Sequence, residues 1–354
     1  MEEFPEYLKG RGAQINPKNQ FQQHRLDTQV EDGLDEPLVP SRETEFIYDH
    51  PKKIINKVSS PDIPLDYSIN PYQGCEHGCT YCYARNSHEY WGYSAGLDFE
   101  RKIIVKPDAP ALLEKELRHP KWEPKPVMFS GNTDCYQPIE RKLNITRQCL
   151  EVFLKYKHPV SIITKNSLVL RDLDLLTELA KDQLVHVFIT ITSLDESLRR
   201  LMEPRTASSI KRLEVVRRLS EAGIPVGVML GPVIPGLNNH EIPNLVKETA
   251  NAGALAAGYT FVRLNGAVGQ IFENWIRKNF PDRADKVLSQ IMGAHGGKLS
   301  DSRFGKRMSG EGEIAKSVAQ LFRISKKKYF EGRSLPAYNL TAFHQTDRGQ
   351  MRLF

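Results

Sequence analysis

The stretch that decides the fold is NPYQGCEHGCTYCYAR, residues 70–85. It places three cysteines within eight residues, Cys75, Cys79 and Cys82, at spacings of four and three. An apolar strand candidate at 66–71 leads into it, so the thiols fall in the loop after a strand. Three thiols at this spacing indicate a binding loop for an inorganic group, and the number three limits which group it is.

Three interpretations of the loop differ in how many thiols they use. A structural zinc site commonly takes four protein ligands from two separated pairs, whereas the other thiols, Cys135 and Cys149, lie far along the chain. A C-x-x-C redox pair explains Cys79 and Cys82 but leaves Cys75 unused. A [4Fe–4S] cluster held by three thiolates uses them all and leaves one iron open for a further ligand, so the cluster fits best.

Outward from this loop, short apolar runs alternate with amphipathic stretches. The expected strands are 66–71, 127–130, 160–164, 185–192, 225–230 and 258–263. The expected helices between and after them include 143–156, 171–181, 208–222 and 311–328. Six strands alternating with helices predict parallel βα units with right-handed crossovers, and therefore an α/β fold that is a partial (β/α)6 TIM-like barrel.

Polar and glycine-rich stretches follow the expected strands one after another. SGNTDCYQP follows the second strand, KNS the third, TSLDE the fourth and GPVIPGLNN the fifth. Because the carboxyl ends of parallel strands meet at one rim, these stretches and the cysteine loop share the place where βα barrels carry their active sites.

The chain is expected to divide into three parts. Residues 1–60 are polar without a sustained period and form an N-terminal arm that packs on the body at Phe21 and Ile47. Residues 61–297 form the barrel core, and residues 298–354 form a basic C-terminal extension with one helix.

Charge and composition restrict the partners and the compartment. The chain carries a net charge of +6, and its last 57 residues hold twelve Lys/Arg against five Asp/Glu, a charge of +7. This segment favours DNA or RNA as a partner, and a solvated basic tail is the alternative. No apolar run is long enough to span a membrane, and no signal peptide is visible. Five sparse cysteines favour the reducing cytoplasm.

The C-x-x-x-C-x-x-C spacing, with Tyr81 just before the last cysteine, resembles the signature of the radical S-adenosylmethionine (SAM) superfamily. The resemblance implies a [4Fe–4S] cluster whose open iron chelates S-adenosylmethionine. One electron from the cluster, supplied by a donor such as flavodoxin or ferredoxin, cleaves the cofactor reductively. The resulting 5′-deoxyadenosyl radical abstracts a hydrogen atom from the substrate.

The resemblance also implies which side chains bind the cofactor. They lie in the cysteine loop and after the second, third and fourth strands: Tyr81, Gly131, Asn132, Thr133, Asp134, Lys165, Thr190, Thr192 and Ser193. In this interpretation Lys165 pairs with the cofactor carboxylate, and a solvated lysine at a strand end is the alternative. The hydroxyls after the fourth strand would contact the carboxylate or the ribose.

Within the superfamily, TYCYAR and GNTDCYQPIE resemble the branch related to spore photoproduct lyase, over roughly residues 60–290. This implies DNA-repair-like, lyase-type chemistry with Tyr83 and Cys135 as candidate catalytic residues. One departure concerns the hydrogen-donating cysteine of the lyase, whose position corresponds to Gly131 here. Three classes therefore stay open: a radical enzyme acting on nucleic acid, a radical enzyme acting on a small molecule, peptide or protein, and a non-catalytic iron–sulfur sensor.

The final five residues, Gln350 to Phe354, read QMRLF. They resemble the short peptide with which bacterial repair and replication proteins dock on the sliding clamp, where a Leu-Phe pair fills an apolar pocket. Self-packing of the pair on its own chain is the alternative.

Overall fold

The computed structural model describes residues 2–3, 7–21, 43–63 and 65–345. Its centre is a seven-stranded sheet in the order β12-β11-β10-β9-β8-β5-β4. All neighbouring strands run parallel except β4, which is antiparallel to β5. The strands are β4 (Ile55–Lys57), β5 (Tyr67–Ile69), β8 (Val127–Phe129), β9 (Val160–Thr164), β10 (Val185–Thr190), β11 (Val226–Val233) and β12 (Ala256–Phe261). The six expected strands are present, and β4 and β12 form the two edges, so the barrel is partial as predicted.

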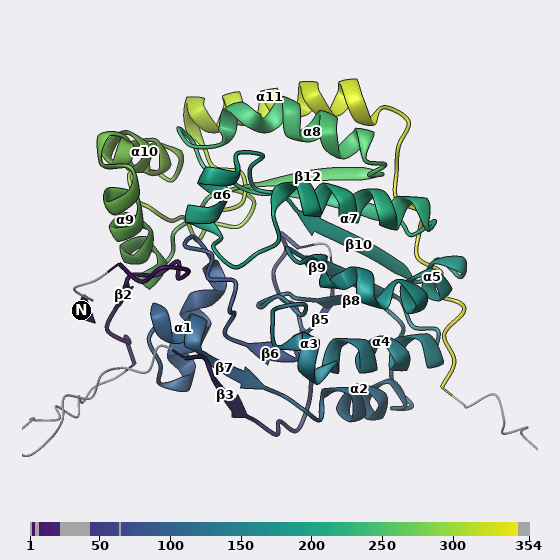
Figure 1. Cartoon of the computed structure of the whole chain (residues 1–354). Helices are drawn as coiled ribbons and strands as arrows, with labels where there is room; N and C mark the ends of the chain where they lie inside the picture. Colours follow the sequence, from purple (N-terminus) through teal and green to yellow (C-terminus); the bar gives the residue numbers. More distant parts are fainter. Residues whose placement is uncertain (1, 4–6, 22–42, 64, 346–354) are drawn as a thin grey trace, which may run out of the picture.

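Helices connect the strands and cover the outer face of the sheet (Figure 1). They are η1 (Tyr83–Trp91), α1 (Leu97–Arg101), α2 (Ala109–Leu117), α3 (Glu140–Leu143), α4 (Ile145–Lys155), η2 (Ser167–Asp172), α5 (Leu173–Lys181), α6 (Glu196–Met202), α7 (Ser209–Glu221), η3 (Asn239–Glu241), α8 (Ile242–Asn251), α9 (Ala267–Asn279), α10 (Pro281–Ala294) and α11 (Gly312–Phe330). None of the described helices combines the length and the apolar character needed to cross a membrane.

Local sequence explains the helices that position the rim. In α4 the residues Ile145, Cys149 and Phe153, four apart, are buried against the sheet, as the amphipathic period predicts. The side chain of Ser208 accepts a hydrogen bond from the Lys211 amide and caps α7. This cap fixes the point at which α7 begins after the loop that follows α6.

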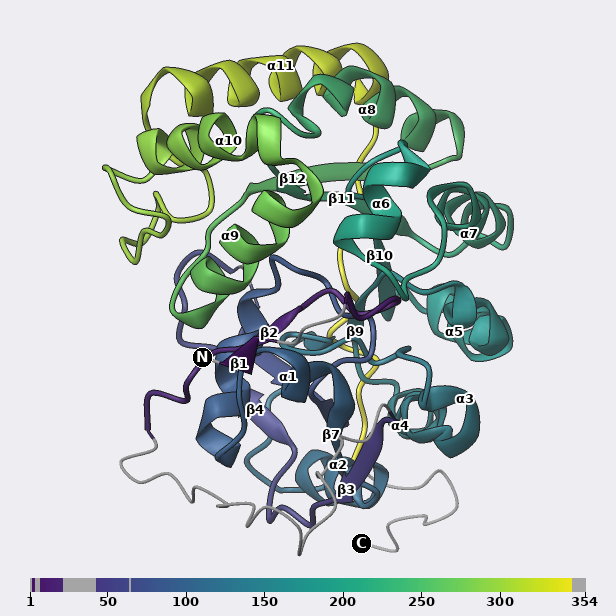
Figure 2. The ribbon, with the colours of Figure 1, turned by 60° about the vertical axis from the view of Figure 1, so that its left-hand side comes forward.

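The N-terminal segment, residues 7–21, is built into the body rather than lying on its surface. Residues 11–15 within it are all buried. Figure 2 shows its strand β2 (Ile15–Asn16), paired with β1 (Glu2–Glu3), lying over α1. Phe21 keeps 52% of its surface exposed, although its ring centroid lies 4.8 Å from that of Tyr90. This packing differs from the surface arm suggested by the polar composition.

A second small sheet joins the rest of the predicted arm to the core. Strands β3 (Glu45–Tyr48) and β6 (Tyr72–Gln73) flank β7 (Lys102–Val105), the first parallel to it and the second antiparallel. Ile47 pairs in register with Ile104 of β7, so the residue expected to pack on the body does so as part of a strand.

The basic extension separates into three parts with different surroundings. A rim loop, residues 301–310, follows α10, and α11 then packs on α8. A C-terminal strap, residues 334–345, crosses the amino-terminal ends of the strands, where Asn339 N donates to Gln183 O (3.1 Å) and His344 N to Tyr156 O (3.2 Å). Figure 1 shows this strap in yellow beside β10 and α5. The strap therefore lies at the end of the barrel opposite the rim.

Candidate active site

The thiol loop, residues 74–82, lies at the carboxyl ends of β5 and β6, as the barrel reading requires. Two of its residues, Gly74 and Gly78, have φ angles of +79° and +68°. A side chain at Gly78 would also meet the Glu100 carboxylate at 2.7 Å. The loop therefore needs glycine at Gly78 for two reasons, and its tight path brings the three cysteines around one space.

The three thiols suit a multinuclear metal cluster, in which each thiolate binds a different metal atom. Cys75 and Cys79 are buried and Cys82 is partly exposed, and Cys75 and Cys82 pack in one small cluster with Phe99. Among the residues that the structure describes, no three His, Cys, Asp or Glu side chains converge closely enough for a single metal ion. A [4Fe–4S] cluster does not require such convergence, because each thiolate binds a different iron. All five cysteines are free thiols, so the three are available as ligands.

Because the thiol loop is buried, ionisation of its thiols depends on nearby positive charge. Burial raises the pKa of Cys79 to about 12, with Glu203 adding to the effect, while Lys165 and Arg212 oppose it. A buried thiol ionises when a metal supplies compensating charge. The donor set is thus suited to iron, and the adjacent cations favour the same ionised form.

A carboxylate on α1 ties the N-terminal segment to the thiol loop. The two oxygens of Glu100, which is fully buried, accept from the backbone amides of Gly12 (3.1 Å) and Ala13 (2.7 Å). The same carboxylate pairs with Arg85 at 2.5 Å, and Arg85 Nε donates to the Cys79 carbonyl at 2.9 Å. A connected set of hydrogen bonds therefore runs from the N-terminal segment to Cys79, a predicted cluster ligand.

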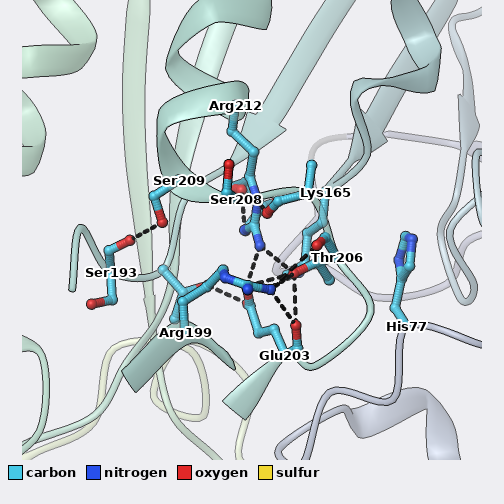
Figure 3. A network of polar contacts seen from close by, with 12 residues as sticks. His77, Lys165, Ser193, Arg199, Glu203, Thr206, Ser208, Ser209 and Arg212 are labelled. Carbon is cyan, nitrogen blue, oxygen red and sulfur yellow. Dashed lines mark hydrogen bonds and ion pairs between the residues drawn. The ribbon is translucent and has the colours of Figure 1, made fainter. Parts of the chain in front are cut away.

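Glu203, just after α6, is the centre of a buried polar network (Figure 3). Its carboxylate accepts from the Tyr81 hydroxyl and from Thr192 Oγ1 (2.6 Å), and it pairs with Arg212 at 2.5 Å. Burial alone would raise the pKa of Glu203, but Arg212, Lys165 and the two hydroxyls lower it to about 2. Two predicted cofactor residues, Tyr81 and Thr192, are thus brought together by a glutamate that lies outside the motifs.

Lys165 differs from its neighbours because its ammonium has no close partner. It follows β9, is half-buried and lies 6.0 Å from the Tyr81 ring centroid. No hydrogen bond or ion pair joins its Nζ to any described residue. Burial lowers the pKa of Lys165, but the nearby Cys79 and Glu203 more than offset this, so the net shift is upward. A charged, unpaired ammonium beside the thiols can bind a carboxylate.

Asp134 has its carboxylate fully engaged by its own surroundings. It accepts from Thr164 Oγ1 (2.7 Å) and from the backbone amides of Lys165 (2.8 Å) and Tyr136 (2.9 Å). His77 of the thiol loop lies 3.3 Å from the carboxylate. Burial would raise the pKa of Asp134, but His77 and these donors hold it at about 2. Asp134 therefore links the thiol loop to the end of β9, and a direct contact with the cofactor stays a prediction.

The other residues after β8 are arranged by Asn70, at the start of the cysteine motif. Its side-chain oxygen accepts from the Asn132 amide at 2.8 Å, while the Thr133 hydroxyl donates to the Tyr72 carbonyl at 2.5 Å. Gly131 offers its carbonyl to the Tyr83 hydroxyl. In this way the loop after β8 is held against the thiol loop, as the site requires.

The remaining candidate residues, Thr190, Ser193 and Cys135, are almost completely buried. Thr190 is 3% exposed at the end of β10, and its carbonyl accepts from Arg212. Ser193 is fully buried, and its hydroxyl donates to Glu241 at 2.6 Å, so in Figure 3 it lies apart from Lys165. Cys135 is fully buried in the main core, where burial raises its pKa well above the usual value. The cofactor and catalytic roles of these residues stay predictions.

Three residues that organise the site were not singled out from the sequence: Glu100, Glu203 and Arg212. Glu203 belongs to MEPRT, a polar run directly after a helix. That run is the one local signal that could have pointed to it. The others lie in ordinary helical or turn sequence, and only the fold brings them to the thiols.

Comparison with known families matches the description "Radical SAM superfamily" to residues 69–249. An uncharacterized protein of Mycobacterium tuberculosis is 33% identical over 65% of this chain and 69% of its own length. An uncharacterized protein of Methanocaldococcus jannaschii is 31% identical over 70% of this chain and 88% of its own length. The matched region begins at the last residue of β5 and contains the thiol loop and the strands β8, β9, β10 and β11.

Solved structures with a similar fold include spore photoproduct lyase complexed with dinucleoside spore photoproduct. It aligns with a TM-score of 0.58 at 19% identity and covers 81% of this chain and 80% of its own. A mutant of that lyase with bound AdoMet and dinucleoside spore photoproduct aligns with a TM-score of 0.59 at 18% identity, covering 83% and 82%. At this identity the likeness concerns the fold.

Proposed function

We propose, from the premise that this chain belongs to the radical SAM superfamily, that it is a radical enzyme whose substrate is a nucleic acid. The family shows it to be a radical SAM enzyme with a [4Fe–4S] cluster and S-adenosylmethionine as cofactors. The observation that carries the site is the unpaired Lys165 beside three thiols on the rim of the barrel. The nucleic acid substrate is supported by the fold shared with a lyase that binds a dinucleoside.

In the proposed site, each group of residues has a separate task. Cys75, Cys79 and Cys82 hold the cluster, and the ammonium of Lys165 pairs with the carboxylate of S-adenosylmethionine. When bound, the two cofactors supply the one-electron chemistry that removes a hydrogen atom from the substrate. Glu203 fixes Tyr81 next to the thiols, and its own charge keeps the Lys165 ammonium protonated.

The lyase analogy also requires a residue that returns a hydrogen atom to the substrate. Cys135 is fully buried, so its thiol has no described path to a substrate at the rim. Gly131 carries no side chain at the position of the lyase cysteine. Tyr83 is 45% exposed beside Cys82 and keeps its hydroxyl on the Gly131 carbonyl. Tyr83 is therefore the better supported candidate for contact with the substrate.

The experiment is formation of 5′-deoxyadenosine by the anaerobically reconstituted, reduced protein, with and without single-stranded DNA. We expect slow formation alone and faster formation with DNA. Absence of 5′-deoxyadenosine in both would instead support a sensor role. If the rate is the same with and without DNA but rises with a peptide or a small molecule, the substrate belongs to that class and is not a nucleic acid.

Two further partners belong to the proposal. An electron donor such as flavodoxin or ferredoxin would reduce the cluster, and the free thiols support a location in the cytoplasm. The clamp peptide at 350–354 lies outside the described residues. The last described residue, Gln345, donates to the His119 carbonyl at 2.7 Å, near the end of α2.

The clamp contact has its own test with the peptide DRGQMRLF. We expect micromolar binding to the clamp of the same organism, equivalent to about 8 kcal/mol, and its loss when the final Leu-Phe pair is replaced by Ala-Ala. If both peptides bind the clamp equally poorly, residues 350–354 do not bind the clamp.

A further inference from the structure

The gap between the two edge strands of the barrel is bridged by the rim loop, residues 301–310. The Phe261 amide at the end of β12 donates to the Met308 carbonyl at 2.8 Å, which anchors the loop to one edge. On the other side, Asp62, which follows β4, accepts from the Gly305 amide at 2.7 Å and pairs with Arg307. The rim loop thus joins both edges of the open sheet.

An arginine without an ion pair lies between the rim loop and the thiol loop. Arg263 follows β12, and its guanidinium carbon lies 5.6 Å from the ring centroid of Tyr83. No carboxylate of the described chain lies within ion-pair distance of it. Burial lowers the pKa of Arg263, as does the neighbouring Arg307, while Tyr83 and Asp62 partly oppose this. A cation in this position has capacity for an anionic ligand.

A second arginine and an exposed ring lie beside the first pair. Arg307 lies 4.5 Å from the ring centroid of Phe304, and this ring is 58% exposed. Isolated exposed apolar residues are common and carry no meaning alone. Here, however, the Arg263–Tyr83 pair and the Arg307–Phe304 pair are neighbours, because Arg263 and Arg307 are close enough to repel each other. Tyr83 directly follows Cys82 in the sequence.

We propose that Tyr83, Arg263, Phe304 and Arg307 form a binding surface for a nucleotide of a single-stranded nucleic acid. Bases of any identity stack on exposed aromatic rings, and an unpaired guanidinium group such as that of Arg263 binds a phosphate. Arg307 is already paired with Asp62, so its part is to hold the rim loop that carries Phe304. The surface therefore presents both chemistries needed for one nucleotide, at the side of the thiol loop. This inference rests on the proposed function and names the face through which its substrate is bound.

The cations of α11 are the competing location, and the structure argues against them. Exposed cations such as Arg323 and Lys327 lie on a helix that packs on the outer helix α8. The Lys328 ammonium lies 5.2 Å from the ring centroid of Tyr329, but this ring is half-buried, and α11 lies in the outer helical layer away from the thiol loop. They can attract a polyanion, but they cannot place a base beside the cluster.

The test is binding of a fluorescein-labelled single-stranded oligothymidylate to the reconstituted full-length protein, followed by anaerobic fluorescence anisotropy at several salt concentrations. Phe304→Ala should weaken binding about 5- to 100-fold, because base–aromatic stacking is lost. Phe304→Trp should retain binding. Arg263→Gln should reduce the slope of log affinity against log salt by about 0.7, the value for one phosphate contact on a single strand.

The matched control is Arg323→Gln on α11, which removes the same charge from outside the surface. We expect it to change the affinity less than Arg263→Gln does. An equal or larger loss in the Arg323 variant would overturn the inference, as would full binding by Phe304→Ala. Formation of 5′-deoxyadenosine by the wild-type protein without nucleic acid separates the two levels. Its absence both without and with nucleic acid would contradict the proposed function, whatever the binding result.

Discussion

Replacing Gly12 by alanine tests whether the N-terminal segment is a structural part of the cluster site. Gly12 approaches the thiol loop so closely that an added Cβ would lie 1.7 Å from the Gly78 carbonyl oxygen and 2.9 Å from its carbon. Both neighbours are backbone atoms, so no flexible side chain can move aside. Real Cβ contacts stay above 3.0 Å, so the two segments must separate by more than 1 Å.

The loss of stability can be worked out from the hydrogen bond that this separation breaks. The Gly12 amide lies 3.1 Å from the Glu100 carboxylate, and a shift of more than 1 Å removes that hydrogen bond. A bond to a charged acceptor contributes about 1.5–3 kcal/mol, and an overpacked contact costs about 1–3 kcal/mol. We therefore expect Gly12→Ala to destabilise the protein by about 3–5 kcal/mol, which lowers Tm by about 4–7 °C in a chain of this length.

The assay has two readouts, Tm followed by circular dichroism and the rate at which reconstituted protein releases iron to a chelator. Iron release should accelerate, because Glu100 also holds Arg85 against the Cys79 carbonyl. Gly293→Ala is the control, since an added Cβ on α10 meets nothing within 4 Å and helical alanine is favoured over glycine. If the Gly12 variant melts and releases iron like the control, the segment does not brace the thiol loop.

Three further changes test the site itself. Cys82→Ala should abolish the reconstituted cluster while Cys149→Ala retains it, as measured by iron and sulfide content; equal iron in both variants would contradict the three-thiol assignment. Lys165→Ala should weaken binding of S-adenosylmethionine by about 1–3 kcal/mol in equilibrium titration, and unchanged affinity would place the cofactor carboxylate elsewhere. The pKa of Glu203 is lowered to about 2, so its stabilising contribution is complete above about pH 5 and is lost as the pH falls toward 2. Glu203→Gln should flatten that part of the stability curve, and an unchanged acid transition in urea unfolding would show that this carboxylate does not govern it.

The sequence predicts the parallel strands and the thiol loop well because both signals are local. Strands buried on both faces read as continuous apolar runs, as in 185–190 and 226–233. The spacing of Cys75, Cys79 and Cys82 lies within one loop, so no tertiary information is needed to find it. These features depend on residues that are neighbours in the chain.

The supports of the site could not be predicted because they are contacts between distant segments. Gly12 meets Gly78, and Glu100 meets Gly12, with no period or motif to mark either pair. Glu203 lies in a polar run that also suits a solvated loop, and its role appears only when Tyr81 and Arg212 reach it. A buried carboxylate needs several donors at once, and these come from separate elements of the fold.

The basic extension shows why a charge count along the sequence does not by itself locate a charged surface. A net charge of +7 adds up along the sequence, whereas the electrostatic potential depends on where each charge lies. The fold sends part of this segment to the rim loop, part to α11 and part to the strap at the opposite end. Most of its described charges lie in the rim loop and on α11, whereas the strap holds no Lys, Arg, Asp or Glu, so a net charge of +7 is not the charge of one surface. The rim surface proposed above includes Arg263, which precedes the extension in sequence, so the segment count leaves out a cation that this proposal uses.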